Sequence, residues 1–293
     1  MAIVSGPASN GIGGRLAGIL GVSNIEVKHR IFPDGESYIN IPDIDDDEAV
    51  VVQSTYYPQD KHLMELLFIA DELRRRGIEK ITAVVPYLAY ARQNRDFSRG
   101  DATSINTVME AFHCVGIRSL VVVEPHKKEV VKPFRGKSAV VSISKSLVKE
   151  LEKRVKDPFV LSPDEGGLDR AVEMAALLNC EYDHVEKERN KSTGKLSAEN
   201  LRNTEIRGRE VIIIDDMIST GGTVAQAAGI AKKNGASRII VAAAHLLMDD
   251  GAYERIGKAG VAEVYGANTI PNGKARQVDI SEDVAEALTE MQK

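Results

Sequence analysis

Residues 211–223 read VIIIDDMISTGGT, and this stretch indicates the fold more strongly than any other part of the chain. The apolar, β-branched run over residues 211–214 predicts a buried strand that ends at two adjacent carboxylates. A short Ser/Thr/Gly loop follows, and residues 224–234 then have the composition of a helix. This order predicts a strand, loop and helix of a parallel α/β sheet, with the loop at the carboxyl end of the strand.

The loop itself has the chemistry of a phosphate site. Its backbone N–H groups, its hydroxyls and the N-terminus of the following helix all suit a phosphate. Gly221 and Gly222 let the backbone close around an anion where a Cβ would obstruct it. Asp215 and Asp216 stand one step away, in the right place to bind the hydroxyls of a sugar that carries the phosphate. The alternative is an ordinary strand, turn and helix, which requires all these features to coincide by chance.

Composition excludes several classes of protein. The chain has 293 residues and 43% hydrophobic content, enough for one large or two medium domains. A net charge of -5 lacks the basic excess of a general nucleic-acid binder. The two cysteines, Cys114 and Cys180, show no paired spacing, which fits a reducing cytosol. We find neither a signal peptide nor the ~20 apolar residues of a membrane span, so we expect a cytoplasmic protein that binds neither nucleic acid nor membrane.

Apolar runs alternate with helical patterns along the chain. Strands are expected at residues 49–53, 81–85, 119–123, 158–161, 211–214 and 239–244, and helices at residues 63–73, 104–115, 168–178 and 224–234. Such alternation predicts an α/β fold with parallel sheets flanked by helices. We expect two such domains, residues 1–140 and residues 141–293. Ligands of open α/β sheets bind beyond the carboxyl ends of the strands, so the segments there should form one site or two facing sites.

Two candidate segments lie in the first half. In Phe32-Pro33-Asp34-Gly35-Glu36, the ring can stack on an adenine while the carboxylates accept hydrogen bonds from its amino group. A Pro-Asp-Gly turn without a ligand is the alternative. After the strand at residues 81–85, Arg92 can bind phosphate oxygens and Gln93 a base or ribose. A solvated basic turn is the alternative there.

Three further candidate segments lie between the strand at residues 119–123 and the strand at residues 211–214. His126 can bind a metal or a triphosphate, or it is a plain surface histidine. Asp164 can hold Mg²⁺, which prefers oxygen ligands, or it belongs to an ordinary turn at a helix start. Lys187 and Arg189 lie in a long polar stretch that can act as a lid over a transferring phosphoryl group, or as a solvated charged loop.

The order of these segments resembles the ribose-phosphate pyrophosphokinase (phosphoribosyl pyrophosphate synthetase) family, from about Phe32 to Ile280. The loop at residues 219–223 resembles the phosphoribosyl pyrophosphate loop of type I phosphoribosyltransferases. The resemblance implies two phosphoribosyltransferase-like domains, with ATP on the N-terminal side and ribose 5-phosphate on the C-terminal side. The last helix is expected to pack back on the N-terminal domain.

The resemblance also implies a reaction, in which the pyrophosphoryl group of Mg-ATP moves to the 1-hydroxyl of ribose 5-phosphate. It assigns catalysis to Lys187 and Arg189. It assigns ATP binding to Phe32, Asp34, Gly35, Glu36, Arg92, Gln93 and His126. It assigns ribose 5-phosphate binding to Asp215, Asp216, Ser219, Thr220, Gly221, Gly222 and Thr223. His126 and Asp164 would hold Mg²⁺. The adenine pocket of this family is completed across a subunit interface, which implies a homo-oligomer, a dimer by default or a hexamer.

Two alternatives share much of this pattern. A phosphoribosyltransferase that consumes phosphoribosyl pyrophosphate would carry the same loop, but it needs neither the doubled α/β architecture nor the polar stretch with Lys187 and Arg189. An inactive, synthetase-like regulatory subunit would keep the fold without the chemistry. The chain also differs from the common family pattern: Glu124-Pro125-His126 replaces Asp-Leu-His, and Asn94 replaces an aspartate.

Overall fold

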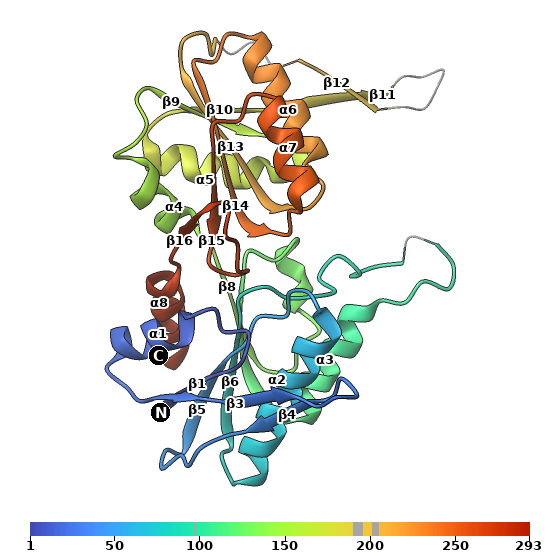
Figure 1. Cartoon of the computed structure of the whole chain (residues 1–293), viewed down its shortest axis with the longest axis vertical. Helices are drawn as coiled ribbons and strands as arrows, with labels where there is room; N and C mark the ends of the chain where they lie inside the picture. Colours follow the sequence, from blue (N-terminus) through green and yellow to red (C-terminus); the bar gives the residue numbers. More distant parts are fainter. Residues whose placement is uncertain (97, 190–195, 201–204) are drawn as a thin grey trace. The chain divides into compact units, whose positions relative to one another are not determined.

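The computed structural model of the chain describes residues 1–96, 98–189, 196–200 and 205–293, and only the backbone of residues 187–189 and 196–200. It contains two compact units (Figure 1). The first consists of Met1–Ser142, Thr269–Pro271 and Asp279–Lys293, and the second of Ile143–Asn268 and Asn272–Val278. Every helix in the described part of the chain is too short or too polar to cross a bilayer.

The first unit is built on a parallel sheet of order β2-β1-β5-β6-β7-β8. Its strands are β1 (Ala2–Ser5), β2 (Asn24–Glu26), β5 (Glu48–Val52), β6 (Lys80–Val85), β7 (Ile117–Val123) and β8 (Lys137–Val141). Its helices are α1 (Ile12–Leu20), α2 (Gln59–Arg75), α3 (Ser104–Cys114) and α8 (Ser281–Gln292). An antiparallel hairpin, β3 (Lys28–Ile31) with β4 (Ser37–Asn40), is inserted between β2 and β5.

The second unit repeats this plan with a parallel sheet of order β10-β9-β13-β14-β15-β16. Its strands are β9 (Pro158–Ser162), β10 (Glu181–His184), β13 (Glu210–Ile218), β14 (Arg238–Leu246), β15 (Glu263–Ala267) and β16 (Arg276–Val278). Its helices are α4 (Ser144–Leu151), α5 (Leu168–Leu178), α6 (Gly222–Lys233) and α7 (Asp250–Lys258). The hairpin of β11 (Glu186–Arg189) and β12 (Leu196–Asn200) follows β10.

The two units therefore share one topology. In each, the first strand lies between the second and the third strand of its sheet, and a two-stranded hairpin is inserted after the second strand. The hairpin that carries residues 32–36 at its tip thus corresponds in chain order to the hairpin that carries Lys187 and Arg189. The sequence halves show no obvious residue-level repeat, so this duplication is visible in the architecture alone.

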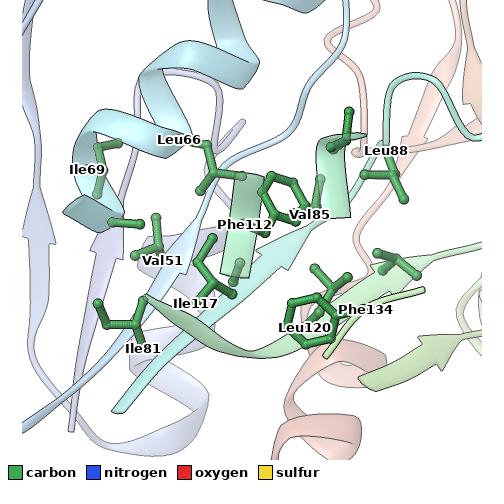
Figure 2. Close-up of a cluster of buried hydrophobic side chains, with 14 of the residues drawn as sticks. Val51, Leu66, Ile69, Ile81, Val85, Leu88, Phe112, Ile117, Leu120 and Phe134 are labelled. Carbon is green, nitrogen blue, oxygen red and sulfur yellow. The ribbon is translucent and has the colours of Figure 1, made fainter. Parts of the chain in front are cut away.

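A buried apolar cluster holds α2 and α3 against one face of the first sheet (Figure 2). Leu66, Ile69 and Leu73 recur at helical spacing on α2 and are fully buried. They pack in one cluster with the strand residues Val51 and Ile81. Because strand side chains alternate between faces, their neighbours on β5 and β6 point to the opposite face. Full burial of each such side chain is worth about 1.5–3 kcal/mol.

The C-terminal helix belongs to the first unit. α8 packs against α1 and β8, and Val284 and Leu288 are buried in its contact surface. Nζ of Lys137 donates a hydrogen bond to the carbonyl of Met291 at 3.1 Å. Earlier in the returning segment, the carbonyl of Thr269 accepts a hydrogen bond from Oγ of Ser54 at 2.7 Å. The end of the chain thus covers the face of the first sheet that α2 and α3 leave open (Figure 1).

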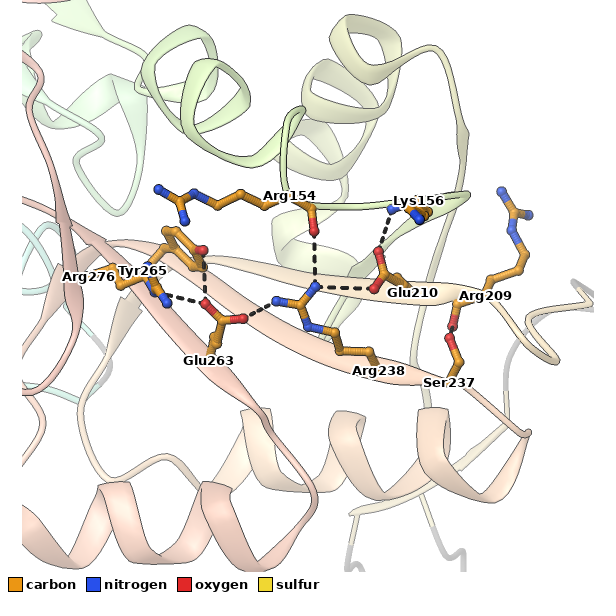
Figure 3. A network of polar contacts seen from close by, with 9 residues as sticks. All are labelled: Arg154, Lys156, Arg209, Glu210, Ser237, Arg238, Glu263, Tyr265 and Arg276. Atoms are coloured by element: carbon orange, nitrogen blue, oxygen red, sulfur yellow. Dashed lines mark hydrogen bonds and ion pairs between the residues drawn. The ribbon is translucent and has the colours of Figure 1, made fainter.

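An ion-pair network ties together the amino ends of strands in the second unit (Figure 3). Arg238, at the start of β14, ion-pairs with Glu210 at 3.2 Å and also with Glu263. Arg276 approaches Glu263 at 2.8 Å from β16. Burial alone would raise the pKa of Glu263, but hydrogen bonds from Arg238 and Tyr265 outweigh it, and this pKa lies below its usual value. The network lies at the edge opposite the carboxyl ends of the strands. We therefore assign it a role in stability and not in ligand binding.

Candidate functional site

Strand β13 carries the acid pair inside its length rather than beyond its end. We expected the strand to stop at Ile214, and this was wrong: β13 continues to Ile218. The reason is its neighbour β14, which is equally long and pairs with β13 as far as Ile218 with Leu246. Asp215 pairs with Ala243, and Asp216 lies between it and the paired Met217, so the sheet fixes this backbone more firmly than a loop would.

The two carboxylates of the acid pair lie close together in a poorly solvated place. The backbone amide of Asp216 donates a hydrogen bond to Oδ1 of Asp215 at 2.9 Å. Burial, followed by the hydrogen bond and charge of Asp216, raises the pKa of Asp215 to about 8, and the charge of Asp164 adds to this. Nη2 of Arg170, on α5, lies 3.8 Å from Oδ2 of Asp216. The site holds more negative than positive charge, so it favours a cation or hydrogen-bond donors.

The loop after β13 leads directly into the N-terminus of α6. Gly221 adopts a left-handed backbone with φ of 71°, and a Cβ there would lie 3.0 Å from Cγ2 of Ile256. Arg255, on α7, donates a hydrogen bond to the carbonyl of Thr220 and so holds the loop in place. The first amides of a helix have no intrahelical acceptor and can bind an anion. Ser219 and Thr220 are exposed, whereas Gly222 and Thr223 are half-buried.

Asp164 lies at the same edge of the second sheet as the acid pair. It follows β9, which pairs with β13 in parallel up to Leu161 with Ile213. Its side chain is half-buried, and its backbone carbonyl accepts a hydrogen bond from Oγ of Ser162 at 2.6 Å. The structure thus brings Asp164 together with the acid pair. These donors are all oxygen atoms, which fits Mg²⁺, although no cluster of three or more metal-ligating side chains occurs among the described residues.

Three candidate residues of the first unit follow strands at the carboxyl edge of its six-stranded sheet. Arg92 and Gln93 follow β6, and His126 follows the adjacent strand β7. The side chains of all three are exposed. Oε1 of Gln93 accepts a hydrogen bond from Oγ of Ser104 at 2.6 Å, which ties this segment to the start of α3. The edge is therefore exposed and basic, as an anionic ligand would require.

Residues 32–36 form the tip of the β3–β4 hairpin, a structure that the sequence pattern did not predict. The amide of Phe32 donates to the carbonyl of Glu36 at 2.8 Å, and the amide of Gly35 donates to that of Phe32 at 2.9 Å. Asp34 accepts a hydrogen bond from the amide of Glu36 at 3.2 Å. The Phe32 ring is 37% exposed, and the guanidinium of Arg30 lies 4.9 Å from its centroid. The tip is thus an ordered turn that presents an aromatic ring.

Lys187 and Arg189 lie on β11, whose backbone begins two residues after the carboxyl end of β10. Their side chains lie outside the described part of the structure, as do residues 190–195 and 201–204. The hairpin therefore starts at the edge that also carries Asp164 and the acid pair.

Sequence reasoning missed three arginines that contact these segments: Arg30, Arg170 and Arg255. Arg30 precedes Phe32 by two residues on an extended strand, a spacing that puts both on one face and offers a usable signal. Arg170 lies on the helix that follows Asp164, which is a weaker signal. Arg255 reaches Thr220 from α7, across 35 residues of sequence, and no local pattern indicates such a contact.

Two parallel α/β units of one topology, with an acid pair and a glycine loop at a helix N-terminus, define a protein with doubled phosphoribosyltransferase architecture. Residues 1–116 match the N-terminal domain of ribose phosphate pyrophosphokinase, and residues 134–265 match the phosphoribosyl transferase domain. The chain belongs to the ribose-phosphate pyrophosphokinase family of enzymes.

Individual relatives cover nearly the whole chain. The ribose-phosphate pyrophosphokinase of Saccharolobus solfataricus is 45% identical over 291 residues, which is 98% of this chain and 100% of that protein. That of Thermococcus kodakarensis is 40% identical over 256 residues, covering 87% and 90% of the two chains. The crystal structure of phosphoribosylpyrophosphate synthetase from Mycobacterium smegmatis superimposes with a TM-score of 0.84 at 26% identity. The match covers 99% of this chain and 98% of that one.

Proposed function

We propose that the protein is a ribose-phosphate diphosphokinase, which transfers the pyrophosphoryl group of ATP to the 1-hydroxyl of ribose 5-phosphate. The observation that carries this proposal is the acid pair on β13, followed by a glycine loop at the N-terminus of α6, in a chain of this family. In the reaction, the sugar oxygen bonds to the β-phosphorus of ATP and the bond from that phosphorus to the α-phosphate oxygen breaks. AMP leaves, and the hydroxyl proton is released.

The second unit would bind ribose 5-phosphate. The loop amides and hydroxyls of residues 219–223 would hold the 5-phosphate, with Gly221 providing the close approach. Asp215 and Asp216 would accept hydrogen bonds from the ribose hydroxyls. This arrangement would suit the local charge. The anionic phosphate would lie against the helix amides, while the ribose hydroxyls would donate to the two carboxylates.

The first unit would bind ATP. The ring of Phe32 would stack on the adenine, while Asp34, Gly35 and Glu36 would hydrogen-bond its edge. Arg92, Gln93 and His126 would contact the phosphates and ribose. We propose that the adenine pocket is completed by a second copy of the chain, so that the active form is a homo-oligomer, a dimer by default or a hexamer.

Asp164 in the second unit and His126 in the first would each offer a ligand to Mg²⁺, and Asp164 is the better match to its preference for oxygen. When bound, Mg²⁺ would neutralise charge on the polyphosphate. Lys187 and Arg189 would stabilise the charge that builds on the transferred group and exclude water from it. Phosphoryl-type transfer depends on such positioning and charge stabilisation rather than on a covalent nucleophile. The expected setting is the cytoplasm.

Nucleotide chromatography separates this function from its alternatives. The purified protein is incubated with ATP and Mg²⁺, with and without ribose 5-phosphate. We expect AMP that depends on the sugar. A phosphoribosyltransferase would leave ATP intact but consume phosphoribosyl pyrophosphate when given a panel of bases. A regulatory subunit would do neither, and that result would overturn the proposal.

A further inference from the structure

Glu65 is a fully buried carboxylate in the middle of α2, with an exposed fraction of 0%. A buried charge is costly unless it is paired and hydrogen-bonded. Oγ of Ser37 donates to its Oε1 at 2.8 Å, and Nε2 of Gln53 donates to its Oε2 at 3.2 Å. Nζ of Lys61, one turn earlier on α2, lies 3.7 Å from Oε1. Glu65 therefore collects partners from β4, from the segment after β5 and from its own helix.

Both strands of the β3–β4 hairpin attach to this one carboxylate. Ser37 is the first residue of β4, and it hydrogen-bonds Glu65 directly. His29, on β3, places Nε2 2.9 Å from Oε1 of Glu65. Glu65 thus clamps the hairpin against α2.

The sheet side of the clamp is fixed by Gln53, which immediately follows β5. Its Oε1 accepts a hydrogen bond from the amide of Ala8 at 2.8 Å. Its Nε2 donates to the carbonyl of His62 at 3.3 Å as well as to Glu65. A Cβ at Gly6 would lie 2.3 Å from Oε1 of Gln53, so this space is filled by the amide. The carboxylate is therefore held in place from the core outward.

The clamp lies next to the hairpin tip. Ser37 directly follows Glu36, and the tip is closed by the hydrogen bond between Phe32 and Glu36. Arg30 stacks its guanidinium over both Phe32 and Tyr38, at 4.9 and 4.5 Å from their ring centroids. These hydrogen bonds and cation–π contacts hold the residues of the tip together. A shift at Ser37 would therefore move the whole turn, including the ring of Phe32.

We infer that Glu65 is a positioning residue for the adenine nucleotide: by clamping both strands of the β3–β4 hairpin, it sets the place of Phe32 and its neighbouring carboxylates. The inference rests on the proposed function of residues 32–36. Glu65 touches no substrate itself, and its effect passes through Ser37 and His29.

The test compares Michaelis constants in the full-length protein. Glu65→Gln keeps the shape but removes the charge, and it leaves Ser37 and His29 with a weaker acceptor. We expect the Michaelis constant for ATP to rise about tenfold, as the loss of a charged hydrogen bond predicts, while that for ribose 5-phosphate and kcat change less than about twofold. Phe32→Ala is the reference, since it should raise the same constant without disturbing the clamp.

Two further variants separate positioning from general loosening. Glu110→Gln makes the same change on α3, at a carboxylate that pairs with Arg135, and should leave both Michaelis constants unchanged. Ser37→Ala removes only the hydroxyl that donates to Glu65, and this variant replaces Glu65→Gln in the test if Glu65→Gln does not fold. The effects of the two changes should be less than additive in the double variant, because both act on the hydrogen bond between Ser37 and Glu65.

Folded Glu65→Gln or Ser37→Ala protein with an unchanged Michaelis constant for ATP would overturn the inference. An equal rise for both substrates would also overturn it, because it would indicate loosening of the whole unit. If the wild-type protein forms no AMP, the proposed function itself fails. If the wild-type protein forms AMP but the Michaelis constant for ATP is unchanged in the Glu65 and Ser37 variants, the inference alone fails.

Discussion

The backbone amide of Asp216 donates a hydrogen bond to the carboxylate of Asp215 at 2.9 Å, so that neighbouring acids on one strand share a single poorly solvated site. Arg170 approaches Asp216 at 3.8 Å, and burial together with Asp216 raises the pKa of Asp215 to about 8. Ionising both carboxylates in the ligand-free site is therefore costly. This cost has consequences for stability as the pH changes.

Asp215→Asn should stabilise the ligand-free protein increasingly as the pH rises. The pKa of Asp215 is about 8 in the folded protein and 3.8 as its reference value. Between these values the folded state binds more protons than the unfolded chain, so this carboxyl lowers stability progressively as pH rises, up to about pH 8. Since one pKa unit is worth about 1.36 kcal/mol, we expect a gain on the order of a few kcal/mol at alkaline pH.

Thermal unfolding of both proteins in a chelating buffer, from about pH 5 to about pH 9, measures this. The melting temperature of the variant should exceed that of the wild type by a margin that widens with pH. A constant margin would show that Asp215 ionises normally.

Gly221→Ala should weaken the binding of ribose 5-phosphate, since we propose that residues 219–223 form its phosphate loop. The left-handed φ of 71° and the 3.0 Å approach to Ile256 both oppose a side chain there. We expect a loss of about 1–3 kcal/mol in stability and at least about a tenfold rise in the Michaelis constant for ribose 5-phosphate. Gly229→Ala on the same helix is the matched control, because its Cβ would meet nothing within 4 Å, and it should stabilise the helix by about 0.5–1 kcal/mol. Equal kinetics for the two variants would argue against a phosphate loop.

Lys187→Ala should reduce turnover by orders of magnitude with little change in folding. The β11–β12 hairpin begins at the carboxyl edge of the second sheet, and a cation on it would act on charge that develops in the transition state. Steady-state kinetics and a thermal melt of the same sample measure the two effects separately. Near-normal turnover would remove Lys187 from the mechanism.

Arg238→Met should lower the stability of the protein while leaving turnover and both Michaelis constants unchanged, the opposite of Lys187→Ala. Arg238 bridges Glu210 and Glu263 at the amino ends of the strands, away from the edge that carries the acid pair (Figure 3). The group is partly exposed, so we expect a cost of about 1–3 kcal/mol, between the values for surface and buried pairs. Because the pKa of Glu263 is lowered in the folded protein, the cost should shrink as acid protonates it. Altered Michaelis constants would show that the network reaches the site.

The central strands and their helices were predictable because their hydrophobic pattern is strong. The helix expected at residues 168–178 has the observed bounds of α5. Strand β1 and helix α1 were not predicted, since β1 is short and α1 contains Gly13, Gly14 and Gly18, which lower helix propensity. This helix is held by its packing against α8, which comes from the far end of the chain. Tertiary contact here outweighs local preference.

The placement of the candidate residues was predictable where chemistry and strand ends lie close together in sequence. The acid pair lies in the last half of β13, the glycine loop and Asp164 follow strands, and the parallel sheet brings them to one edge. The hairpin around residues 32–36 was not predicted as one, because β3 and β4 are largely exposed and lack a clean hydrophobic alternation. Its clamp, Glu65, gave no signal either, since a glutamate on an amphipathic helix usually faces solvent.

The central claim is pyrophosphoryl transfer, and phosphorus-31 NMR of the protein with ATP, Mg²⁺ and ribose 5-phosphate tests it most directly. We predict that AMP and a sugar bearing a pyrophosphoryl group appear in equal amounts, that neither forms without the sugar, and that ADP does not accumulate. Formation of ADP with a singly phosphorylated sugar product would mean transfer of one phosphoryl group and would contradict the account.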